Sequence, residues 1–242
     1  MVGLTDEVRE SAHAWRVGVE YQALVDVHTL ETVAHEALAR FRGADGSSLP
    51  PCRVFSELRC ESELLSAVEL QLKELQIERA PGRSVFLNVD PEAWHAGSPR
   101  TRKQLVDLLA APGEVEIVVE VVETGDASAA ARARAFMKEL SDAKVTIALD
   151  DVGASGAVFS IDALRCADVV KFDRSFLDRP RDPRERAIAR GLVAVARALG
   201  ARTVLEGVER PEHLRLAEEL GFDLVQGFLL GDRTIVVDPV AG

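Results

Sequence analysis

The sequence predicts an α/β fold, a TIM-like (β/α)8 barrel, and three observations support this prediction. Short apolar runs rich in β-branched residues recur along the chain, and each is followed by a polar residue and then by a helical pattern. This alternation is typical of a parallel sheet covered by helices. There are eight such runs in 242 residues, and a closed barrel of this kind typically needs roughly 250 residues. An open doubly wound sheet is the alternative.

The eight runs give the expected strands, and the spacing of the first two gives a direction. Only the short segment 26–31 joins the first strand to the second, which is too little for a crossover helix. We therefore expect the first strand to run antiparallel to the rest. The expected strands are 19–27, 32–38, 84–89, 114–122, 145–149, 168–172, 202–205 and 223–230.

Helical patterns lie between several of these strands. Residues 126–140 and 184–199 repeat apolar side chains at helical spacing. A third helix should begin at Pro211, a first-turn proline, and end before Gly221. The residues expected to face inward are Ala129, Ala133, Phe136 and Leu140 in the first helix, Ile188, Leu192, Val195 and Leu199 in the second, and Leu214, Ala217 and Leu220 in the third.

We divide the chain into an N-terminal helical extension, 1–16, and one domain, 17–242, in which segment 43–51 is expected to be loop because it is rich in Gly, Ser and Pro. The start of the chain lacks the basic and then apolar pattern of a secretory signal. Nowhere do about 18 consecutive apolar residues suggest a membrane span. The expected location is the cytoplasm.

The charge balance limits the class of partner. The chain has 29 basic and 40 acidic residues, a formal net charge of −11, which opposes a broad attraction to DNA or to anionic lipid surfaces. A small phosphate ligand is still compatible, because local cations and a bound metal can override the global field. Cys52, Cys60 and Cys166 lack the spacing of a zinc site and form an odd set, so we interpret them as ordinary thiols.

Polar residues follow or close seven of the expected strands. In a barrel the active site lies at the C-terminal ends of the strands, so these side chains should converge. One such carboxylate alone would more often be a helix N-cap or a solvated strand end. Several together would repel one another unless cations neutralised them. The residues are Glu36, Asn88, Glu120, Asp150 with Asp151, Lys171, Glu206 and Gln226.

This set of side chains favours a site for hard divalent metal ions. Carboxylate and carboxamide oxygens suit Mg²⁺ or Mn²⁺, and the absence of a His or Cys cluster argues against zinc. The adjacent pair Asp150–Asp151 could let one carboxylate bridge two ions. Two metals roughly 3.5–4 Å apart are the usual machinery for in-line attack on phosphorus.

The same residues, in their order, resemble the EAL domain of cyclic-di-GMP phosphodiesterases over about 19–231. A lone Glu-Ala-Leu is frequent by chance, but the ordered series is specific. It comprises Tyr21-Gln22, Glu36-Ala37-Leu38-Ala39-Arg40, Leu87-Asn88, Glu120-Val121-Val122-Glu123, Asp150-Asp151-Val152-Gly153, Lys171-Phe172-Asp173-Arg174-Ser175-Phe176, Glu206-Gly207-Val208-Glu209 and Gln226-Gly227-Phe228.

The resemblance implies a role for each residue in the hydrolysis of cyclic di-GMP to linear pGpG. It implies that Lys171 positions the attacking water and that Glu123 braces a loop, while Glu206 is a candidate general base. The implied ligands are Glu36, Asn88, Glu120 and Asp150 for a first metal, and Asp150, Asp151 and Glu206 for a second; the implied contacts to the nucleotide are Gln22, Arg40, Asp173, Glu209 and Gln226, with Arg40 on a phosphate.

The loop after Asp151 departs from the family pattern, Asp-Asp-Phe-Gly-Thr-Gly-Tyr-Ser-Ser. Here Val152 replaces the Phe, Ala154 replaces the Thr, and the second glycine is displaced to Gly156. Val122 also lacks the Thr hydroxyl that is usual between Glu120 and Glu123. In the family this loop couples metal binding and dimerisation to turnover, so the change bears more on activity than on ligand binding.

Three functions are therefore weighed. The first is a metal-dependent cyclic-di-GMP phosphodiesterase. The second is a catalytically weak or inactive EAL module that acts as a cyclic-di-GMP receptor or as a regulator through a protein partner. The third, a proton-abstracting lyase barrel, explains the carboxylates but not the ordered motifs. The resemblance also implies a homodimer, with Phe159, Ile161 and Leu164 as candidate contacts unless they belong to the core.

Overall fold

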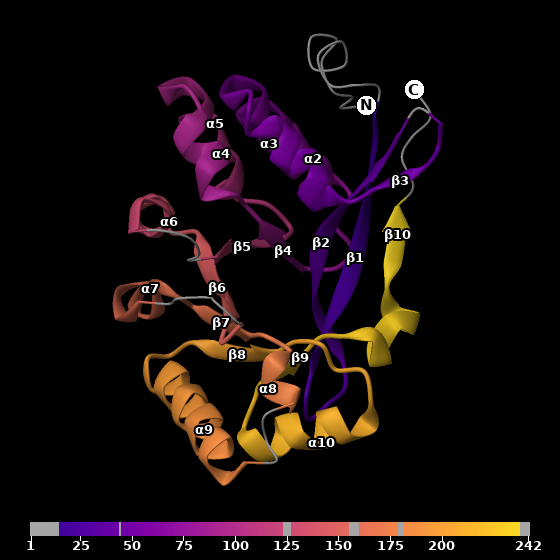
Figure 1. The fold of residues 1–242 in the computed structure, drawn as a ribbon, viewed down its shortest axis with the longest axis vertical. Coiled ribbons are helices and arrows are strands. Elements are labelled where there is room, and N and C mark those ends of the chain that lie inside the picture. Colours follow the sequence, from indigo (N-terminus) through magenta and orange to yellow (C-terminus); the bar gives the residue numbers. More distant parts are fainter. Residues whose placement is uncertain (1–14, 44, 123–126, 155–159, 179–181, 238–242) are drawn as a thin grey trace.

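The protein forms a closed barrel of eight strands, with helices packed outside its parallel strands (Figure 1). The computed structural model describes residues 15–43, 45–122, 127–154, 160–178 and 182–237. The last barrel strand pairs back onto the first, which closes the ring. Around the ring the strands are β1 (Arg16–Asp26), β2 (Thr32–Arg42), β4 (Ser84–Asn88), β5 (Glu116–Val122), β6 (Thr146–Val152), β7 (Val169–Phe172), β8 (Arg202–Leu205) and β9 (Leu224–Val225).

Strand β1 runs antiparallel to its neighbours, as the short connection to β2 predicted. It pairs antiparallel with both β2 and β9, whereas the pairs from β2 and β4 round to β8 and β9 are parallel. The Asp26 carboxylate accepts hydrogen bonds from the backbone N–H groups of His28 and Thr29. This local turn reverses the chain without a crossover helix. The prediction of a TIM-like barrel with one antiparallel strand is confirmed.

The helices lie outside the barrel and follow the parallel strands (Figure 1). They are α2 (Pro51–Leu58), α3 (Ser62–Glu78), α4 (Pro91–Ala96), α5 (Pro99–Leu109), α6 (Ala127–Asp142), α7 (Ile161–Cys166), α8 (Ser175–Asp178), α9 (Pro183–Ala198) and α10 (Pro211–Leu220). Helix α10 begins at Pro211 and ends at Gly221, whose φ of 86° provides the left-handed C-cap. Both predicted ends of this helix are confirmed.

The predicted inward face of α9 is wrong at three of its four positions. Ile188, Val195 and Leu199 are 51%, 47% and 50% exposed, while Leu192 is partly buried and packs against the core. The fully buried residues are Ala189, Val193 and Ala196. The sequence carries two apolar stripes on this helix, and helical periodicity alone cannot choose between them. The other two predicted faces are largely buried, although Ala129 and Leu214 are only partly so.

Several predicted strand ends also differ from the structure. Strand β2 continues to Arg42, because it stays paired with β1 along a long hairpin. Strand β9 ends at Val225, and a 3-10 helix, Phe228–Arg233, replaces the predicted end of the strand. A Cβ on Gly227 would lie 2.3 Å from the Val208 backbone nitrogen, so the chain is pressed against the segment after β8 and leaves the sheet there.

Two further strands lie outside the barrel ring. Segment 43–51, predicted to be loop, contains the short strand β3 (Ser48–Leu49), which pairs with β2, and its last residue begins α2. Strand β10 (Ile235–Val237) pairs antiparallel with residues 19–21 of β1. Residues 1–14 of the predicted helical extension lie outside the described residues, and Arg16 begins β1.

One apolar side chain from each barrel strand fills the barrel interior. These eight residues form one buried cluster: Leu24, Ala34, Phe86, Val118, Ala148, Val169, Val204 and Leu224. A much larger apolar cluster packs between the outer face of the sheet and the helices. The interior cluster therefore closes the barrel as a floor, and anything bound inside must lie above it.

Two further observations concern the helices and the cysteines. Among the described residues, no helix combines the length and hydrophobicity that a membrane crossing requires. Cys52, Cys60 and Cys166 are exposed free thiols, which confirms their interpretation as unpaired cysteines.

The floor predicts a stability test. Phe86→Ala should reduce the free energy of unfolding by about 3–5 kcal/mol, because it opens a cavity in a closely packed cluster. Phe228→Ala is the matched control, because that ring is 77% exposed whereas Phe86 is 3% exposed. Urea unfolding followed by circular dichroism measures both variants. Equal losses would contradict the assignment of Phe86 to the barrel floor.

Candidate active site

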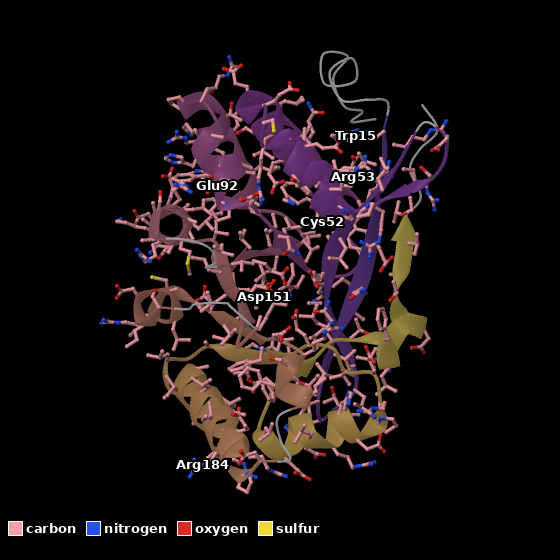
Figure 2. The ribbon with its side chains drawn as sticks, viewed as in Figure 1. Trp15, Cys52, Arg53, Glu92, Asp151 and Arg184 are labelled. Carbon is pink, nitrogen blue, oxygen red and sulfur yellow. The ribbon has the colours of Figure 1, made fainter. Side chains whose placement is uncertain are left out.

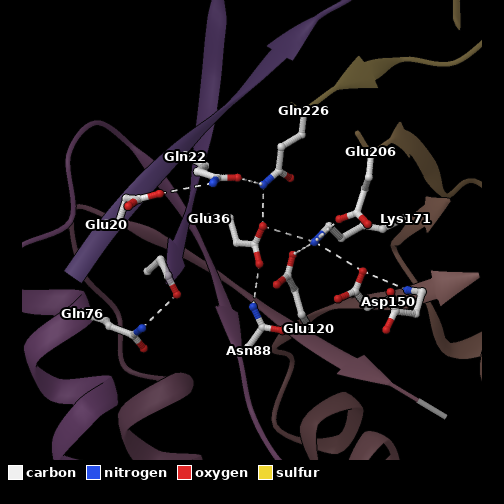
Figure 3. A network of polar contacts seen from close by, with 12 residues as sticks. Glu20, Gln22, Glu36, Gln76, Asn88, Glu120, Asp150, Lys171, Glu206 and Gln226 are labelled. Atoms are coloured by element: carbon white, nitrogen blue, oxygen red, sulfur yellow. Dashed lines mark hydrogen bonds and ion pairs between the residues drawn. The ribbon is translucent and has the colours of Figure 1, made fainter. Parts of the chain in front are cut away.

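A ring of polar side chains lies directly above the apolar floor. Side chains alternate between the two faces of a strand, so residues two positions from the floor residues also point into the barrel. In the parallel strands these residues follow the floor, and in antiparallel β1 the residue precedes it. The ring is Gln22, Glu36, Asn88, Glu120, Asp150, Lys171, Glu206 and Gln226, and Figure 3 shows these side chains meeting.

This geometry brings most of the predicted metal ligands together. They meet because they share the inner face of the barrel, and not because each of them ends a strand. Glu36 does not end its strand, because β2 continues to Arg42. It reaches the site because it lies two residues after Ala34 on the inner face of the barrel. The two-residue periodicity, rather than the strand ends, is the signal that identifies the complete ring.

Lys171 lies at the centre of the ring, fully buried among four carboxylates (Figure 3). Its Nζ is 2.8 Å from Glu206 Oε1 and 3.3 Å from Asp150 Oδ1. It lies 3.6 Å from Glu36 Oε2 and forms its shortest ion pair with Glu120. Burial alone lowers the pKa of this ammonium, but the charges of Asp150, Glu120, Glu206 and Glu36 raise it well above its usual value. Lys171 therefore stays protonated.

One ammonium cannot neutralise four carboxylates. Burial and the charge of Glu36 raise the pKa of Glu120 well above its usual value despite Lys171. Burial likewise raises the pKa of Glu206 to about 8, again against the effect of Lys171. The pKa of Asp150 is raised in the same way by burial, and Glu36 adds to the rise. The ring holds more negative charge than its own cation balances, so it favours further positive charge.

Glu36 is the carboxylate that the surrounding protein holds best. The Asn88 side-chain amide donates a 2.6 Å hydrogen bond to its Oε1, and the Gln226 amide donates to its Oε2. Gln226 also donates to Gln22 at 3.2 Å. Burial raises the pKa of Glu36, but Lys171 and the hydrogen bonds from Gln226 and Asn88 lower it below its usual value overall. This side chain is therefore fixed as a carboxylate.

The pair Asp150–Asp151 needs an irregular strand. Consecutive residues of a regular strand point to opposite faces, but the register of β6 against β7 shifts between Leu149 and Val152, and Asp151 has a φ of 57°. This irregularity brings Asp150, Asp151 and Glu206 together, with one oxygen of each within 4.8 Å of the others. A Cβ on Gly153 would lie 2.0 Å from the Phe176 ring, so only glycine fits directly after the irregularity.

The residues of the ring fit a divalent metal ion. The donors are carboxylate and carboxamide oxygens, the set that Mg²⁺ and Mn²⁺ prefer. Glu120 Oε2 is buried and accepts no hydrogen bond from any described residue. Asp150, Asp151 and Glu206 add a compact oxygen cluster beside it. A bound cation would supply the positive charge that the raised carboxylate pKa values favour.

A cavity of about 560 Å³ opens beside the ring. Glu36, Asn88, Glu120 and Asp151 line one side of it, and residues of α2 and α3 line the other. Two of its lining residues, Cys52 and Asp151, are labelled in Figure 2. A cavity of this size is typical of small-molecule sites. A ligand in it would contact the carboxylate ring at one side only.

Arg40 lines the cavity but is held by an acidic partner. Its Nη2 lies 2.8 Å from Glu20 Oε1, and its Nε donates to Glu20 Oε2 at 3.0 Å. The hydrogen bond from Arg40 is the main reason that the pKa of Glu20 is lowered. A phosphate bound by Arg40 would share it with Glu20, a residue that the sequence analysis did not single out.

Two other expected nucleotide contacts, Asp173 and Glu209, do not line the cavity. The Asp173 carboxylate accepts from the backbone N–H of Ser175 at the start of α8, and its charge helps to raise the pKa of Asp151. Glu209 is exposed, and its backbone N–H donates to His213 Nδ1. Glu123 lies outside the described residues.

A second polar group, not predicted from the sequence, lies in the cavity wall. Glu69, Lys73 and Gln76 lie on α3 at buried positions and line the cavity with Arg59 and Asp90. Their spacing of four and three residues places them on one face of the helix, among the apolar residues Leu65, Val68 and Leu72. Polar residues that interrupt an apolar helix face were the signal that could have revealed them.

Comparison with known proteins decides the family. The model of the EAL domain matches residues 5–232. The chain belongs to the EAL domain family. That match covers every residue of the polar ring and all eight barrel strands, in agreement with the resemblance carried by the ordered motifs.

Relatives of this EAL domain include longer proteins. An uncharacterized protein, y4lL, of Sinorhizobium fredii is 30% identical over 88% of this chain. The probable cyclic di-GMP phosphodiesterase PdeN of Escherichia coli K12 is 25% identical over 87% of it. The chain spans 26% and 42% of the lengths of these two relatives. A solved Klebsiella pneumoniae BlrP1 manganese/cy-diGMP complex has a TM-score of 0.72 at 22% identity, over 97% of this chain and 62% of that one.

The central ammonium predicts a stability test for this EAL domain. Lys171→Met should lower the free energy of unfolding by about 3–5 kcal/mol, because it leaves buried carboxylates without their internal cation. Adding Mn²⁺ should recover part of the loss, because an ion that binds only the folded state stabilises it. Lys138→Met, which removes an exposed ion pair with Asp142, is the control and should change nothing measurable. Urea midpoints that coincide for the two variants would contradict this account.

Proposed function

We propose that this EAL domain is a metal-dependent phosphodiesterase that hydrolyses one phosphodiester bond of cyclic di-GMP to give linear pGpG, and so controls the level of a second messenger. The observation that carries the proposal is that four carboxylates of the polar ring surround Lys171, beside a cavity of about 560 Å³. Two findings on other proteins support the choice of substrate and metal: the name of the relative PdeN, and the manganese and cyclic-di-GMP ligands of BlrP1.

The metal ligands are assigned as the resemblance implies. Mg²⁺ or Mn²⁺, when bound, supplies an acidified water and neutralises charge on the phosphate. The residues that would hold the first ion are Glu36, Asn88, Glu120 and Asp150, and those for the second are Asp150, Asp151 and Glu206. The 2.6 Å hydrogen bond between Asn88 and Glu36 and the 4.8 Å cluster of Asp150, Asp151 and Glu206 support this division.

Lys171 and Glu206 are assigned to the attacking water. The water oxygen bonds to phosphorus, one P–O ester bond breaks, and the product carries one terminal phosphate and one free hydroxyl. Lys171 would orient the water and offset charge on the phosphoryl oxygens. Glu206, 2.8 Å from Lys171 Nζ, would accept the proton of the water, and this proton balances the one that the leaving oxygen takes up to become the free hydroxyl. Glu36 would contribute through the metal it holds.

The residues assigned to contact the nucleotide rest on different observations. Arg40 would bind a phosphate, because its guanidinium lines the cavity. Gln22 and Gln226 would orient Glu36 and reach the ligand from the same end of the ring, since both belong to its hydrogen-bond chain. Asp173 and Glu209 would shape the edge of the site near Asp151 and after β8.

A second candidate function is a cyclic-di-GMP receptor without turnover. The altered loop favours it, because Ala154 and Val122 lack the hydroxyls of the family pattern, while 155–159 lie outside the described residues. Val122 lines the cavity and pairs with Asp150 in the sheet, whereas Glu36, Asn88 and Arg40 lie on other strands. A receptor would bind the nucleotide intact, and an enzyme would release pGpG.

Turnover tests the proposal directly. Wild-type protein with Mn²⁺ should convert cyclic di-GMP to pGpG, measured by chromatography, and EDTA should stop the reaction. Glu36→Ala and Asp150→Asn should abolish turnover because each removes a metal ligand. Arg40→Ala should raise KM about ten- to hundredfold with a smaller effect on kcat, as expected for a lost hydrogen bond between charged groups.

Asp142→Asn, an exposed carboxylate on α6, is the control for Asp150→Asn and should retain full turnover. Wild-type protein that binds cyclic di-GMP in Mn²⁺ without consuming it would favour the receptor. Equal activity of the Glu36, Asp150 and Arg40 variants would refute the site assignment.

We also propose that the domain forms a homodimer through the face of α7 and α9. Ile161 is 74% exposed, and the exposed stripe of α9 adds Ile188, Val195 and Leu199. Leu164, a predicted contact, is buried in the core, and Phe159 lies outside the described residues. Exposed apolar side chains that gather on a surface are typical of protein interfaces.

Charged side chains introduced on the exposed stripe of α9 test the proposed dimer. The double variant Val195→Glu, Leu199→Glu should shift the mass measured by light scattering from dimer to monomer, because it places charged groups in an apolar interface. Ala131→Glu, on the exposed face of α6, is the control and should leave the mass unchanged. A wild-type monomer at all concentrations would rule out the dimer.

A further inference from the structure

Three buried polar side chains on α3 require an explanation. Glu69 and Lys73 are each 2% exposed, and Gln76 is 1% exposed. Burying an ion pair removes two charges from water, and apolar side chains of similar volume are often equally or more stable in its place. Stability alone therefore gives no reason for these residues. None of the three belongs to the polar ring, although all three line the same cavity.

At one end the group holds the backbone of β2 beside Glu36. The Gln76 amide donates a 2.8 Å hydrogen bond to the carbonyl of Ala37, the residue after Glu36. The parallel pairing of β2 with β4 ends at Ala37, so this bond from α3 holds the edge of β2 that β4 no longer covers, while β1 pairs with its other edge. Tyr21 on β1 donates to the Gln76 carbonyl at 2.8 Å, which ties the helix to the same hairpin.

At the other end the group holds the backbone after Asn88. Glu69 Oε1 accepts a 3.2 Å hydrogen bond from the N–H of Asp90, two residues after Asn88. The Asp90 carboxylate is itself held, because it caps α4 and pairs with Arg59 at 2.8 Å. The segment that leaves β4 is therefore fixed from α3 directly after the metal ligand.

Lys73 joins the two ends. Its Nζ donates to Gln76 Oε1 at 3.0 Å and lies 3.5 Å from Glu69 Oε1. The result is a continuous buried path from Ala37 through Gln76, Lys73 and Glu69 to Asp90. The path spans the two strands that carry Glu36 and Asn88, whose side chains are 2.6 Å apart.

We propose that Glu69, Lys73 and Gln76 form a positioning unit that sets the Glu36–Asn88 half of the metal site through the backbones of β2 and β4. The inference rests on the proposed function for the identity of those two ligands. Groups that orient metal ligands from outside typically change metal affinity 10- to 100-fold when they are removed. The three residues would act without touching the ion or the reacting phosphate.

Mn²⁺ affinity of the full chain tests the unit without relying on activity. Lys73→Met and Gln76→Leu should each weaken Mn²⁺ binding about 10- to 100-fold, measured from the electron paramagnetic resonance of free Mn²⁺. The Mn²⁺ concentration for half-maximal turnover should rise by the same factor, while kcat at saturating Mn²⁺ recovers. A role in stability alone would lower the unfolding midpoint and leave the affinity unchanged.

Two further variants keep the test decisive. Thr203→Val removes a hydrogen bond that another fully buried side chain, Thr203, donates to Asp223, and should leave Mn²⁺ affinity unchanged. Glu69→Leu combined with Lys73→Met replaces the whole ion pair, avoids an unpaired buried charge if Lys73→Met alone does not fold, and should still weaken Mn²⁺ binding.

The outcomes separate this inference from the proposed function. Wild-type protein that binds Mn²⁺ but forms no pGpG would refute the enzyme and leave the positioning test intact. Unchanged Mn²⁺ affinity in folded Lys73 and Gln76 variants would overturn the positioning unit. Weaker cyclic-di-GMP binding with unchanged Mn²⁺ affinity would also overturn it, because Lys73 would then contact the nucleotide itself.

Discussion

The excess of negative charge around Lys171 is the constraint on which the functional part of this structure depends. Four carboxylates enclose one ammonium inside the barrel. Such a group is stable only if the scaffold holds it together against its own repulsion. A closed barrel does this, because each member of the ring is anchored to a different strand and the hydrogen-bonded strands cannot separate independently. The site therefore depends on the closed barrel and on the apolar floor beneath it.

The alternation of side chains along the strands explains how a short sequence can specify this site. Each strand needs only an apolar residue for the floor and a polar residue two positions away. Val169 and Lys171 on β7 and Val118 and Glu120 on β5 are examples. The chemistry can therefore be identified from the sequence once the strands are known, without knowledge of the side-chain conformations.

What the sequence could not predict depends on tertiary contacts. The barrel, the antiparallel β1 and both ends of α10 follow from local signals: run spacing, connection length and capping residues. The length of β2 does not, because it is set by pairing with β1 beyond the point where β2 pairs with β4. The inward face of α9 does not either, because the helix carries two apolar stripes and periodicity alone does not distinguish them.

The Asp150–Asp151 irregularity belongs to the same class. A regular strand would point the two carboxylates apart, and only the register shift against β7 and the positive φ of Asp151 bring both to Glu206. The dipeptide alone does not predict this conformation. Gly153 is the local hint, because its lack of a side chain makes room for the Phe176 ring.

The two halves of the ring are held by different means, and this difference bears on the altered loop. Glu36 and Asn88 lie on strands that α3 braces through a buried polar path. Asp150 and Asp151 depend on the irregular end of β6, which leads into the segment that departs from the family pattern. Lys171 connects the halves, because it contacts Glu36 on one side and Asp150 on the other. Under the proposed assignment, a change in the loop would act first on Asp151 and the second ion. The proposed nucleotide contact Arg40 lies on β2 with Glu36, so the two candidate functions would differ in one half of the site and share the other.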